Sequence, residues 1–269
     1  HKEYLGESIS KIAKAKAGII KKNVPTIISK QSSVVRKIIE EKCKENGSDA
    51  IWSEEGFTVS ISSKSIIQKD SHRKIEFPFP NLTGTHQVIN ALTAISALTH
   101  LNIPDKYICE GLKSAYWPAR LQKIENGSLY ELITSYNIKN QLWVDGGHNE
   151  DASVQLRNSM GFINKKHLHI IYGSLKNKDH NSFLMNLVGI ASSLSVVHIK
   201  DQPSSLLQTV AVSTAKKVGW EKIYSAHNIR DAIKYICSQN EGGGSHASIL
   251  ICGSLYLAGQ ALEENGVPI

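Results

Sequence analysis

The feature that most constrains the fold is an alternation of short apolar runs with helix-like segments through the second half of the chain. Strand-like runs are expected at residues 129–134, 141–145, 167–172, 194–199 and 248–252. Helical periodicity is expected at residues 150–158, 180–190, 205–217, 228–238 and 255–264. Strands that alternate with helices form parallel βαβ units. This half is therefore predicted to fold as a doubly wound, mostly parallel, Rossmann-like α/β sheet.

The first half of the chain has a different order of expected helices and strands. Helical spacing is expected at residues 8–22 and 32–45, short strands and turns follow, and an unusually apolar helix is expected at 86–101. A further helix is expected to start at Pro104, because proline favours the first turn of a helix. After Trp117-Pro118 the pattern changes to alternating strands and helices, so a domain boundary is predicted there.

Composition is that of a globular protein without membrane segments. The 269 residues are 41% hydrophobic and 20% charged, and no apolar run approaches the roughly 20 residues of a membrane helix. The four cysteines show no Cys-x-x-Cys pair, which favours free thiols in a reducing cytosol. We therefore expect a cytoplasmic protein. The cysteines are Cys43, Cys109, Cys237 and Cys252.

The net charge of +7 indicates anionic partners. The cations of the first 40 residues lie on helix-like segments with few aromatic residues between them, and no nucleic-acid-binding motif is present. The simplest interpretation of these cations is a solvated helix face. Among binding partners, a small anionic substrate or nucleotide is favoured over nucleic acid.

The most informative local motif covers residues 141–150. An apolar run ends in Asp145, two glycines allow a tight turn, and His148 and Asn149 follow. Parallel α/β sheets bind ligands at the carboxyl ends of their strands, which is where this motif presents its polar side chains. The motif therefore predicts a binding site at this edge of the sheet.

Other polar residues suit the same chemistry. A histidine such as His1 can ligate a divalent cation, and the amine of Lys16 can add carbon dioxide to become an anionic carbamate. Arg120 has a planar guanidinium whose N–H groups can donate two parallel hydrogen bonds to phosphate oxygens. The Asn90 amide can bond a base, and the Asp145 carboxylate can accept ribose hydroxyls. Together these side chains indicate binding of ATP and Mg²⁺.

On these residues the whole chain resembles the C-terminal part of a folylpolyglutamate synthase or bifunctional dihydrofolate synthase, within the Mur ligase superfamily. The motifs that carry the resemblance are His-x-x-x-Leu-Gly at 1–6 with Lys16-Ala17-Gly18-Ile19, the segment from Gly84 to Asn90, Trp117-Pro118-Ala119-Arg120, Asp145-Gly146-Gly147-His148-Asn149, and the segment from Gly253 to Gly259. The last segment separates this family from the peptidoglycan Mur enzymes better than the others do.

The resemblance implies two domains and a reaction. Residues 1–117 would be the C-terminal part of a P-loop-type central ATPase domain, and residues 118–269 the glutamate-side domain. The expected enzyme is an ATP-dependent carboxylate–amine ligase that joins L-glutamate to dihydropteroate, or to the glutamate tail of reduced folates, through an acyl phosphate. It is expected to be a monomer and to use two Mg²⁺ ions.

The resemblance also implies roles for residues. Lys16, Arg120 and His148 are expected to be catalytic, with Asn90, Arg120 and Asp145 binding ATP. His148 and Ser254 are hypothesised to bind glutamate, with the loop at Lys178-Asp179 as a weaker candidate. His1 and Lys16, as the carbamate, are expected to hold metal.

Departures from the family pattern keep two alternatives open. Ala119 stands where the family more often has Gly, and Gly147 where it more often has Ala. The Gly-rich phosphate loop is not found in this sequence. The chain is therefore expected to be a fragment that is inactive alone. The alternatives are a non-catalytic remnant that binds nucleotide weakly or only scaffolds a partner, and another Mur-type amide ligase.

Overall fold

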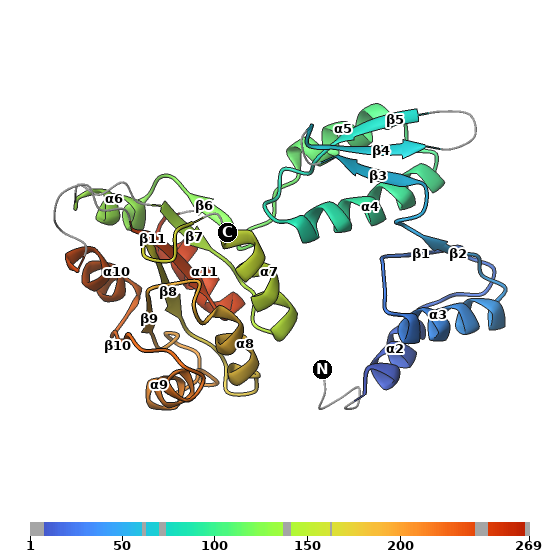
Figure 1. Ribbon diagram of the computed structural model, residues 1–269. Helices are drawn as coiled ribbons and strands as arrows, with labels where there is room; N and C mark the ends of the chain where they lie inside the picture. The colour runs from blue at the N-terminus through green and yellow to red at the C-terminus, as the bar shows by residue number, and fades with distance from the viewer. Residues whose placement is uncertain are drawn as a thin grey trace. The chain divides into compact units, whose positions relative to one another are not determined.

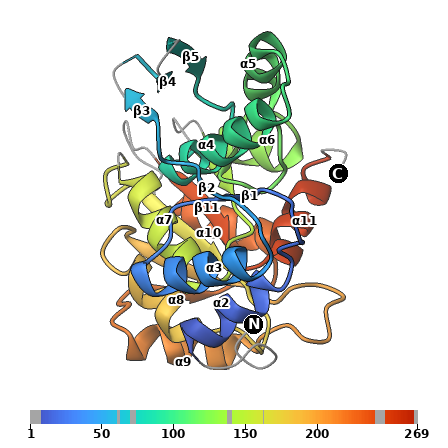
Figure 2. The same cartoon turned by 90° about the vertical axis from the view of Figure 1, so that its right-hand side faces the viewer.

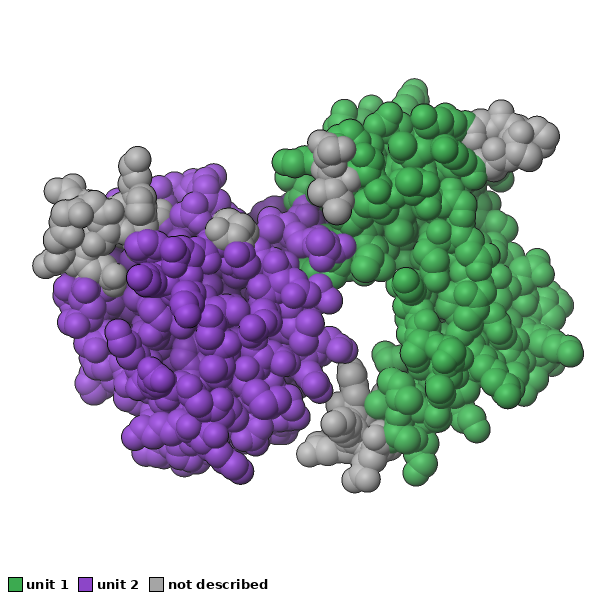
Figure 3. All heavy atoms as spheres, viewed as in Figure 1, with its two compact units in different colours: residues 1–81, 86–115 green, residues 82–85, 116–269 purple. Residues whose placement is uncertain are grey.

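The computed structural model describes residues 8–60, 63–69, 74–136, 141–161, 163–239 and 247–266. The chain divides into two compact units (Figure 3). The first unit comprises residues 1–81 and 86–115, and the second comprises residues 82–85 and 116–269. The predicted roles of residues 1–117 and 118–269 as ATPase-type and glutamate-side domains stay a prediction.

The first unit begins with a helix pair beside a small parallel sheet. Its elements are α2 (Ile9–Ala17), β1 (Thr26–Ile28), α3 (Ser33–Glu45) and β2 (Ala50–Trp52), with β1 parallel to β2. Helix α2 packs along α3 (Figure 2) through a core that includes Ala17, Ile20 and Cys43. The Ser8 hydroxyl caps α2 by accepting the Lys11 N–H at 3.3 Å. The helix ends at Ala17, earlier than the expected residue 22.

An antiparallel sheet backed by helices completes this unit. Its elements are β3 (Phe57–Ser60), β4 (Ser65–Lys69), β5 (Lys74–Pro78), α4 (Thr85–His100) and α5 (Asp105–Ser114). Ile66 and Phe77 from the strands pack with Ile95 of α4 and Ile108 of α5. The apolar helix expected at 86–101 and the helix expected from Pro104 are thus present.

The second unit is built on a six-stranded sheet in the order β10-β9-β8-β11-β7-β6. All neighbours are parallel except β6, which is antiparallel to β7. The predicted doubly wound, mostly parallel α/β fold is therefore confirmed. The strands are β6 (Gln122–Ile124), β7 (Gln141–Val144), β8 (Leu168–Tyr172), β9 (Ser193–Val196), β10 (Ile223–Ser225) and β11 (Ser248–Cys252).

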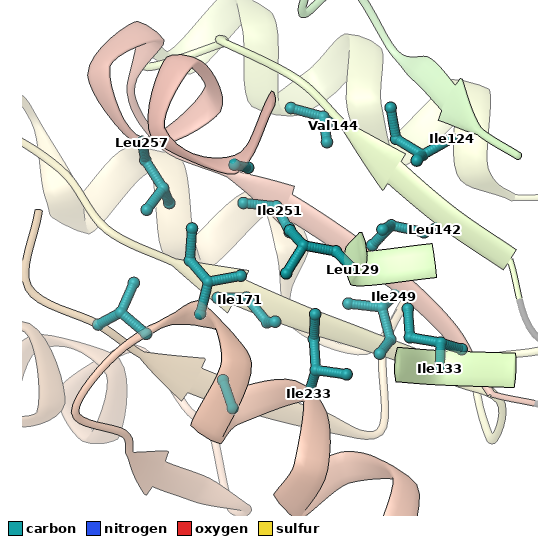
Figure 4. Packing of buried hydrophobic residues seen from close by; sticks show 14 of the residues in the cluster. Ile124, Leu129, Ile133, Leu142, Val144, Ile171, Ile233, Ile249, Ile251 and Leu257 are labelled. Atoms are coloured by element: carbon teal, nitrogen blue, oxygen red, sulfur yellow. The ribbon is translucent and has the colours of Figure 1, made fainter. Parts of the chain in front are cut away.

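Helices cover both faces of this sheet (Figure 1). Helices α7 (Glu150–Met160), α8 (His180–Leu187) and α9 (Gln208–Lys217) pack in a row. Helix α6 (Ser128–Thr134) packs against both α10 (Ile229–Ser238) and α11 (Leu255–Glu264). In the central strand β11, Ile249 and Ile251 join the α6–α10–α11 core (Figure 4), while Leu250 and Cys252 join the α7–α8–α9 core. Alternate residues of a strand face opposite sides, so a strand buried on both sides must be apolar throughout.

One sequence prediction in this unit is wrong. Residues 129–134 were expected to form a strand, but they lie in helix α6. Leu129 and Ile133, four residues apart, are fully buried on one helical face. A short apolar run does not distinguish a buried helix from a buried strand. The strands β6 and β10, each of three residues, were not predicted.

The structure also bears on the thiols and on membrane insertion. All four cysteines are free, as expected, and Cys43, Cys237 and Cys252 are buried. Within the described ranges, no helix combines the length and the apolar character needed to cross a membrane.

Candidate functional site

The carboxylate of Asp145 organises the carboxyl end of β7. It is buried and accepts two backbone hydrogen bonds, from Leu121 N–H to Oδ2 and from Gly147 N–H to Oδ1, both at 2.7 Å. The first bond reaches back to the segment before β6, and the second closes the turn that follows β7. These two bonds fix the position of the Asp145 carboxylate at the end of β7.

Arg120 lies in the segment that Asp145 holds. Its neighbours Ala119 and Leu121 are buried and have left-handed backbone angles, with φ of 56° and 44°. The carbonyl of Ala119 accepts the Gly146 N–H at 2.8 Å, and the Ala119 N–H donates to the Gln122 side chain at 3.0 Å. These contacts fix both sides of Arg120 while its side chain is exposed. No ion pair joins its guanidinium to another described residue, so it is available to an anion.

His148 stands at the turn between β7 and α7. Its Nδ1 lies 3.1 Å from the carbonyl oxygen of Gly146. A carbonyl only accepts, so Nδ1 carries the hydrogen, and Nε2 of the neutral imidazole is left as an acceptor. Asn149 then caps α7 by accepting the Ala152 N–H at 2.8 Å. The half-buried imidazole is therefore oriented by the turn itself.

The space around position 147 has room only for glycine. A Cβ at this position would lie 2.7 Å from Asp145 Oδ1 and 2.8 Å from the Cβ of Ala152. Real Cβ atoms do not approach neighbours so closely, and the methyl group of Ala152 cannot rotate away. In this chain the turn is built for glycine, although the family pattern more often has alanine here.

The end of β11 lies next to this turn. The Gly253 N–H donates to the Gly147 carbonyl at 3.1 Å, and the Asp145 N–H donates to the Ile251 carbonyl at 2.9 Å. Ser254 is 2% exposed and caps α11, where its hydroxyl accepts the Tyr256 N–H at 3.1 Å. Its predicted role in glutamate binding stays a prediction, and the structure adds this capping role.

The remaining predicted residues belong to the first unit. Lys16 is exposed in the last turn of α2. Asn90 is exposed on α4 and donates to the Gln87 side chain at 3.2 Å. His1 lies outside the described residues, within which no three His, Cys, Asp or Glu side chains gather to hold a metal ion.

Sequence reasoning missed a buried polar pair at the end of β8. The Tyr172 hydroxyl and His180 Nδ1 are 3.0 Å apart. Burial raises the pKa of Tyr172 and lowers the pKa of His180, which favours the uncharged form of both groups. Gly253, with φ of +111°, passes directly over Tyr172, where a Cβ would lie 2.6 Å from the ring. The Tyr-Gly dipeptide ending an apolar strand was the available signal.

Residues 128–264, all in the second unit, match the family described as "Dihydrofolate synthetase, C-terminal domain". The chain belongs to this family. It is 26% identical over 273 residues to the dihydrofolate synthase/folylpolyglutamate synthase of Bacillus subtilis, covering 95% of this chain and 58% of the relative. It is 24% identical over 269 residues to the folylpolyglutamate synthase of Lacticaseibacillus casei, covering 96% of this chain and 58% of the relative. The family member thus spans less than two thirds of the length of these relatives.

Solved structures of low identity share the fold. The folylpolyglutamate synthase of Mycobacterium tuberculosis, complexed with ADP and AMPPCP, matches with a TM-score of 0.80 at 22% identity, covering 100% of this chain and 62% of the other. The bifunctional folylpolyglutamate synthase/dihydrofolate synthase of Yersinia pestis, complexed with AMPPNP and Mn ion, matches with a TM-score of 0.76 at 18% identity, covering 98% of this chain and 58% of the other.

Proposed function

We propose that this chain takes part in the ATP-dependent joining of L-glutamate to dihydropteroate, to the glutamate tail of reduced folates, or to both. The observation that carries the proposal is the bond from Leu121 N–H to Asp145, which holds exposed Arg120 at the carboxyl edge of a sheet. That sheet lies in a unit whose residues match the dihydrofolate synthetase C-terminal domain. The names of the curated relatives support the same reaction class.

The reaction has two steps. The γ-phosphoryl group of ATP moves to an oxygen of the substrate carboxylate, giving an acyl phosphate and ADP. The glutamate nitrogen then attacks the acyl carbon and loses a proton, and phosphate leaves as the amide bond forms. Phosphoryl transfer depends mainly on alignment and charge neutralisation, so a fixed guanidinium is the kind of group it needs.

Arg120 and Asp145 are proposed to contact ATP from the second unit, and Asn90 from the first. Arg120 has the charge and the free donors for phosphate oxygens. Asp145 supplies a carboxylate, the group that accepts hydrogen bonds from ribose hydroxyls, and its two backbone bonds hold it in place. The ADP- and AMPPCP-bound synthase that shares this fold supports a nucleotide ligand.

His148 and Ser254 are proposed to bind glutamate. His148 Nε2 can accept from the ammonium group of glutamate, since its Nδ1 is engaged with Gly146. The Ser254 hydroxyl accepts in its capping bond and retains a hydrogen to donate to a carboxylate. His148 is further proposed to help move the proton that the attacking amine loses.

A divalent cation is proposed as a cofactor, supported by the Mn ion in a structure of the same fold. Such an ion neutralises phosphate charge when bound. The described residues form no metal cluster by themselves, so Lys16, as a carbamate, and His1 would need further ligands such as phosphate oxygens. Formation of the carbamate joins carbon dioxide to the Lys16 amine with loss of one proton. A ¹³C carbamate signal after labelled bicarbonate is added, lost in Lys16→Arg, is the expected readout.

The test uses the protein encoded by the complete gene and labelled L-glutamate. We expect incorporation of label into dihydropteroate or tetrahydrofolate together with release of ADP. Arg120→Ala is expected to lower the rate by about 100-fold, the scale of losing one transition-state donor, and Arg120→Lys by less. Lys217→Ala, an exposed cation on α9, serves as the control with an unchanged rate. Absence of incorporation into both acceptors, or a full rate in Arg120→Ala, would overturn the proposal.

A further inference from the structure

A cavity lined by polar residues lies at the carboxyl ends of β9 and β10. Its volume is about 400 Å³, and its lining includes His198, Lys200, His227, Arg230, Gln260 and Glu264. His198 and His227 each follow their strand by two residues, so the cavity opens on the same edge of the sheet as the β7 turn. That is the edge at which parallel α/β sheets bind ligands.

The chain presents these side chains in a regular way. After β9, Val197 and Ile199 are buried while His198 and Lys200 are exposed. The two polar residues therefore emerge on the side opposite the core. The backbone of this segment is held by Gln260, whose Oε1 accepts the Lys200 N–H at 3.1 Å.

Arg230 is the anchored cation of the cavity. It lies in the first turn of α10, and its Nη2 donates to the Ser128 hydroxyl at 2.7 Å and to the Glu264 carbonyl at 3.4 Å. Its Nε and Nη1 make no hydrogen bond to another residue in the described part of the chain. A guanidinium that uses only one nitrogen in such bonds keeps its other N–H donors for a carboxylate or phosphate.

The other polar side chains of the lining can also contact an anion. The imidazoles of His198 and His227 form no hydrogen bond with any described residue. Among the described residues, the Lys200 amine forms an ion pair only with Asp201, at 3.9 Å, and both side chains are largely exposed, so this pair contributes little.

The neighbouring carboxylates are already engaged by amides. Glu264 accepts from the Gln260 Nε2 at 2.8 Å, and Asp231 accepts from the Asn228 Nδ2 at 3.1 Å. Asn228 also caps α10, so the positive end of a ten-residue helix faces the same region. The cavity thus offers several hydrogen-bond donors to an anion.

We propose that this cavity binds the carboxylates of a γ-linked glutamyl chain, an inference that rests on the proposed function. Several separated donors suit an oligocarboxylate, and the volume falls within the roughly 300–1,000 Å³ of small-molecule sites. In the sheet order, β9 is three strands from β7. Strand spacing makes this about 14 Å along the edge. An extended α-linked residue spans roughly 3.5 Å, and a γ-linked one more, so a few glutamyl units bridge the distance from the His148 turn.

The binding test titrates γ-linked mono-, di- and triglutamate, and separately inorganic phosphate, into the 269-residue chain. The readouts are calorimetry and the imidazole NMR signals of His198 and His227, assigned by single His→Gln variants. Affinity is expected to rise with glutamyl chain length and to shift both imidazole signals. The variants His198→Gln/His227→Gln and Lys200→Gln are expected to weaken triglutamate binding by about tenfold, the scale of one charge-assisted hydrogen bond. Lys217→Gln is the matched surface control.

Two results would overturn the proposal. Phosphate binding as strong as that of triglutamate, with no dependence on chain length, would make the cavity a phosphate site. Absence of triglutamate binding at millimolar concentration would exclude the glutamyl chain. Thermal unfolding of each variant separates lost binding from lost folding, because the exposed residues 198, 200 and 227 are not expected to support the fold.

A kinetic arm separates this inference from the proposed function. In the complete-gene protein, the double histidine variant is expected to raise KM for a polyglutamylated folate by about tenfold and to leave KM for dihydropteroate unchanged. Equal effects on both acceptors would overturn the tail site while glutamate incorporation still stands. Triglutamate binding without any incorporation would instead support the site and contradict the reaction.

Discussion

The carboxylate of Asp145 accepts the backbone N–H of Leu121 at 2.7 Å, across 24 positions of sequence. The residue predicted to bind ATP therefore also holds the segment that carries Arg120. Because Ala119 and Leu121 both have left-handed backbone angles, the segment depends on such tertiary bonds to keep its path. The proposed nucleotide contact and the local stability thus depend on the same carboxylate.

Asp145→Asn is expected to destabilise the second unit by about 1–3 kcal/mol. The amide NH₂ of asparagine must face either the Leu121 N–H or the Gly147 N–H, and one buried donor loses its acceptor. Urea denaturation of the 269-residue chain measures the change. Asp201→Asn is the control, since Asp201 is largely exposed and asparagine tolerates its φ of 54°. Equal midpoints for Asp145→Asn and the unmodified chain would show that these bonds contribute nothing to stability.

Two Gly→Ala substitutions are expected to have opposite signs. Gly147→Ala places a Cβ 2.8 Å from that of Ala152 and is expected to cost about 1–3 kcal/mol. Gly259→Ala lies in helix α11 with no atom within 4 Å of the new Cβ, and is expected to stabilise by about 0.5–1 kcal/mol. Thermal unfolding of both variants checks this. A neutral Gly147→Ala would mean that the turn relaxes into the alanine form usual in the family.

Ala119 is expected to tolerate glycine but not valine. In Ala119→Gly, release from the left-handed backbone gains about 1–2 kcal/mol. The lost buried methyl costs about 0.8 kcal/mol, and the freer unfolded chain costs about 0.5–1 kcal/mol. The net change is then within about 1 kcal/mol. Ala119→Val adds branching and volume at a buried, left-handed position and is expected to cost more than about 2 kcal/mol. Chemical denaturation that ranks valine equal to glycine would contradict this account.

Stability is expected to fall in mild acid because of His169. Burial, with smaller contributions from His167 and Lys222, lowers the pKa of His169 from 6.5 to about 4. The folded state therefore binds fewer protons than the unfolded state between these values, so stability decreases as pH falls from about 6.5 to about 4. The shift corresponds to about 3 kcal/mol at the acid end. Urea midpoints across this range measure the slope, and His169→Gln is expected to flatten it. Parallel curves for the two proteins would assign the acid sensitivity to other groups.

Parts of the candidate site were predictable because they directly follow strands. An apolar run that ends in Asp145 and two glycines predicts a turn at a sheet edge. The apolar run of β11, followed by Gly253 and Ser254, predicts a second turn at such an edge. The partners of these residues were not predictable. The Leu121 N–H carries no local signal, because the Asp145 carboxylate that accepts its bond lies 24 positions away. The Tyr-Gly dipeptide at the end of β8 marks Tyr172 but does not indicate that His180 is its partner.

The sequence by itself determined the parallel sheet, because apolar strands alternating with amphipathic helices can bury their faces only in layers. The tertiary structure alone decided that residues 128–134 are a helix. The Leu129 N–H at the start of α6 donates to Asn265 Oδ1 at 3.0 Å, and Asn265 Nδ2 donates to the Asn126 carbonyl at 2.9 Å. The first N–H groups of a helix need acceptors from outside it. Here the acceptor lies 136 positions away, where no local pattern of sequence could indicate it.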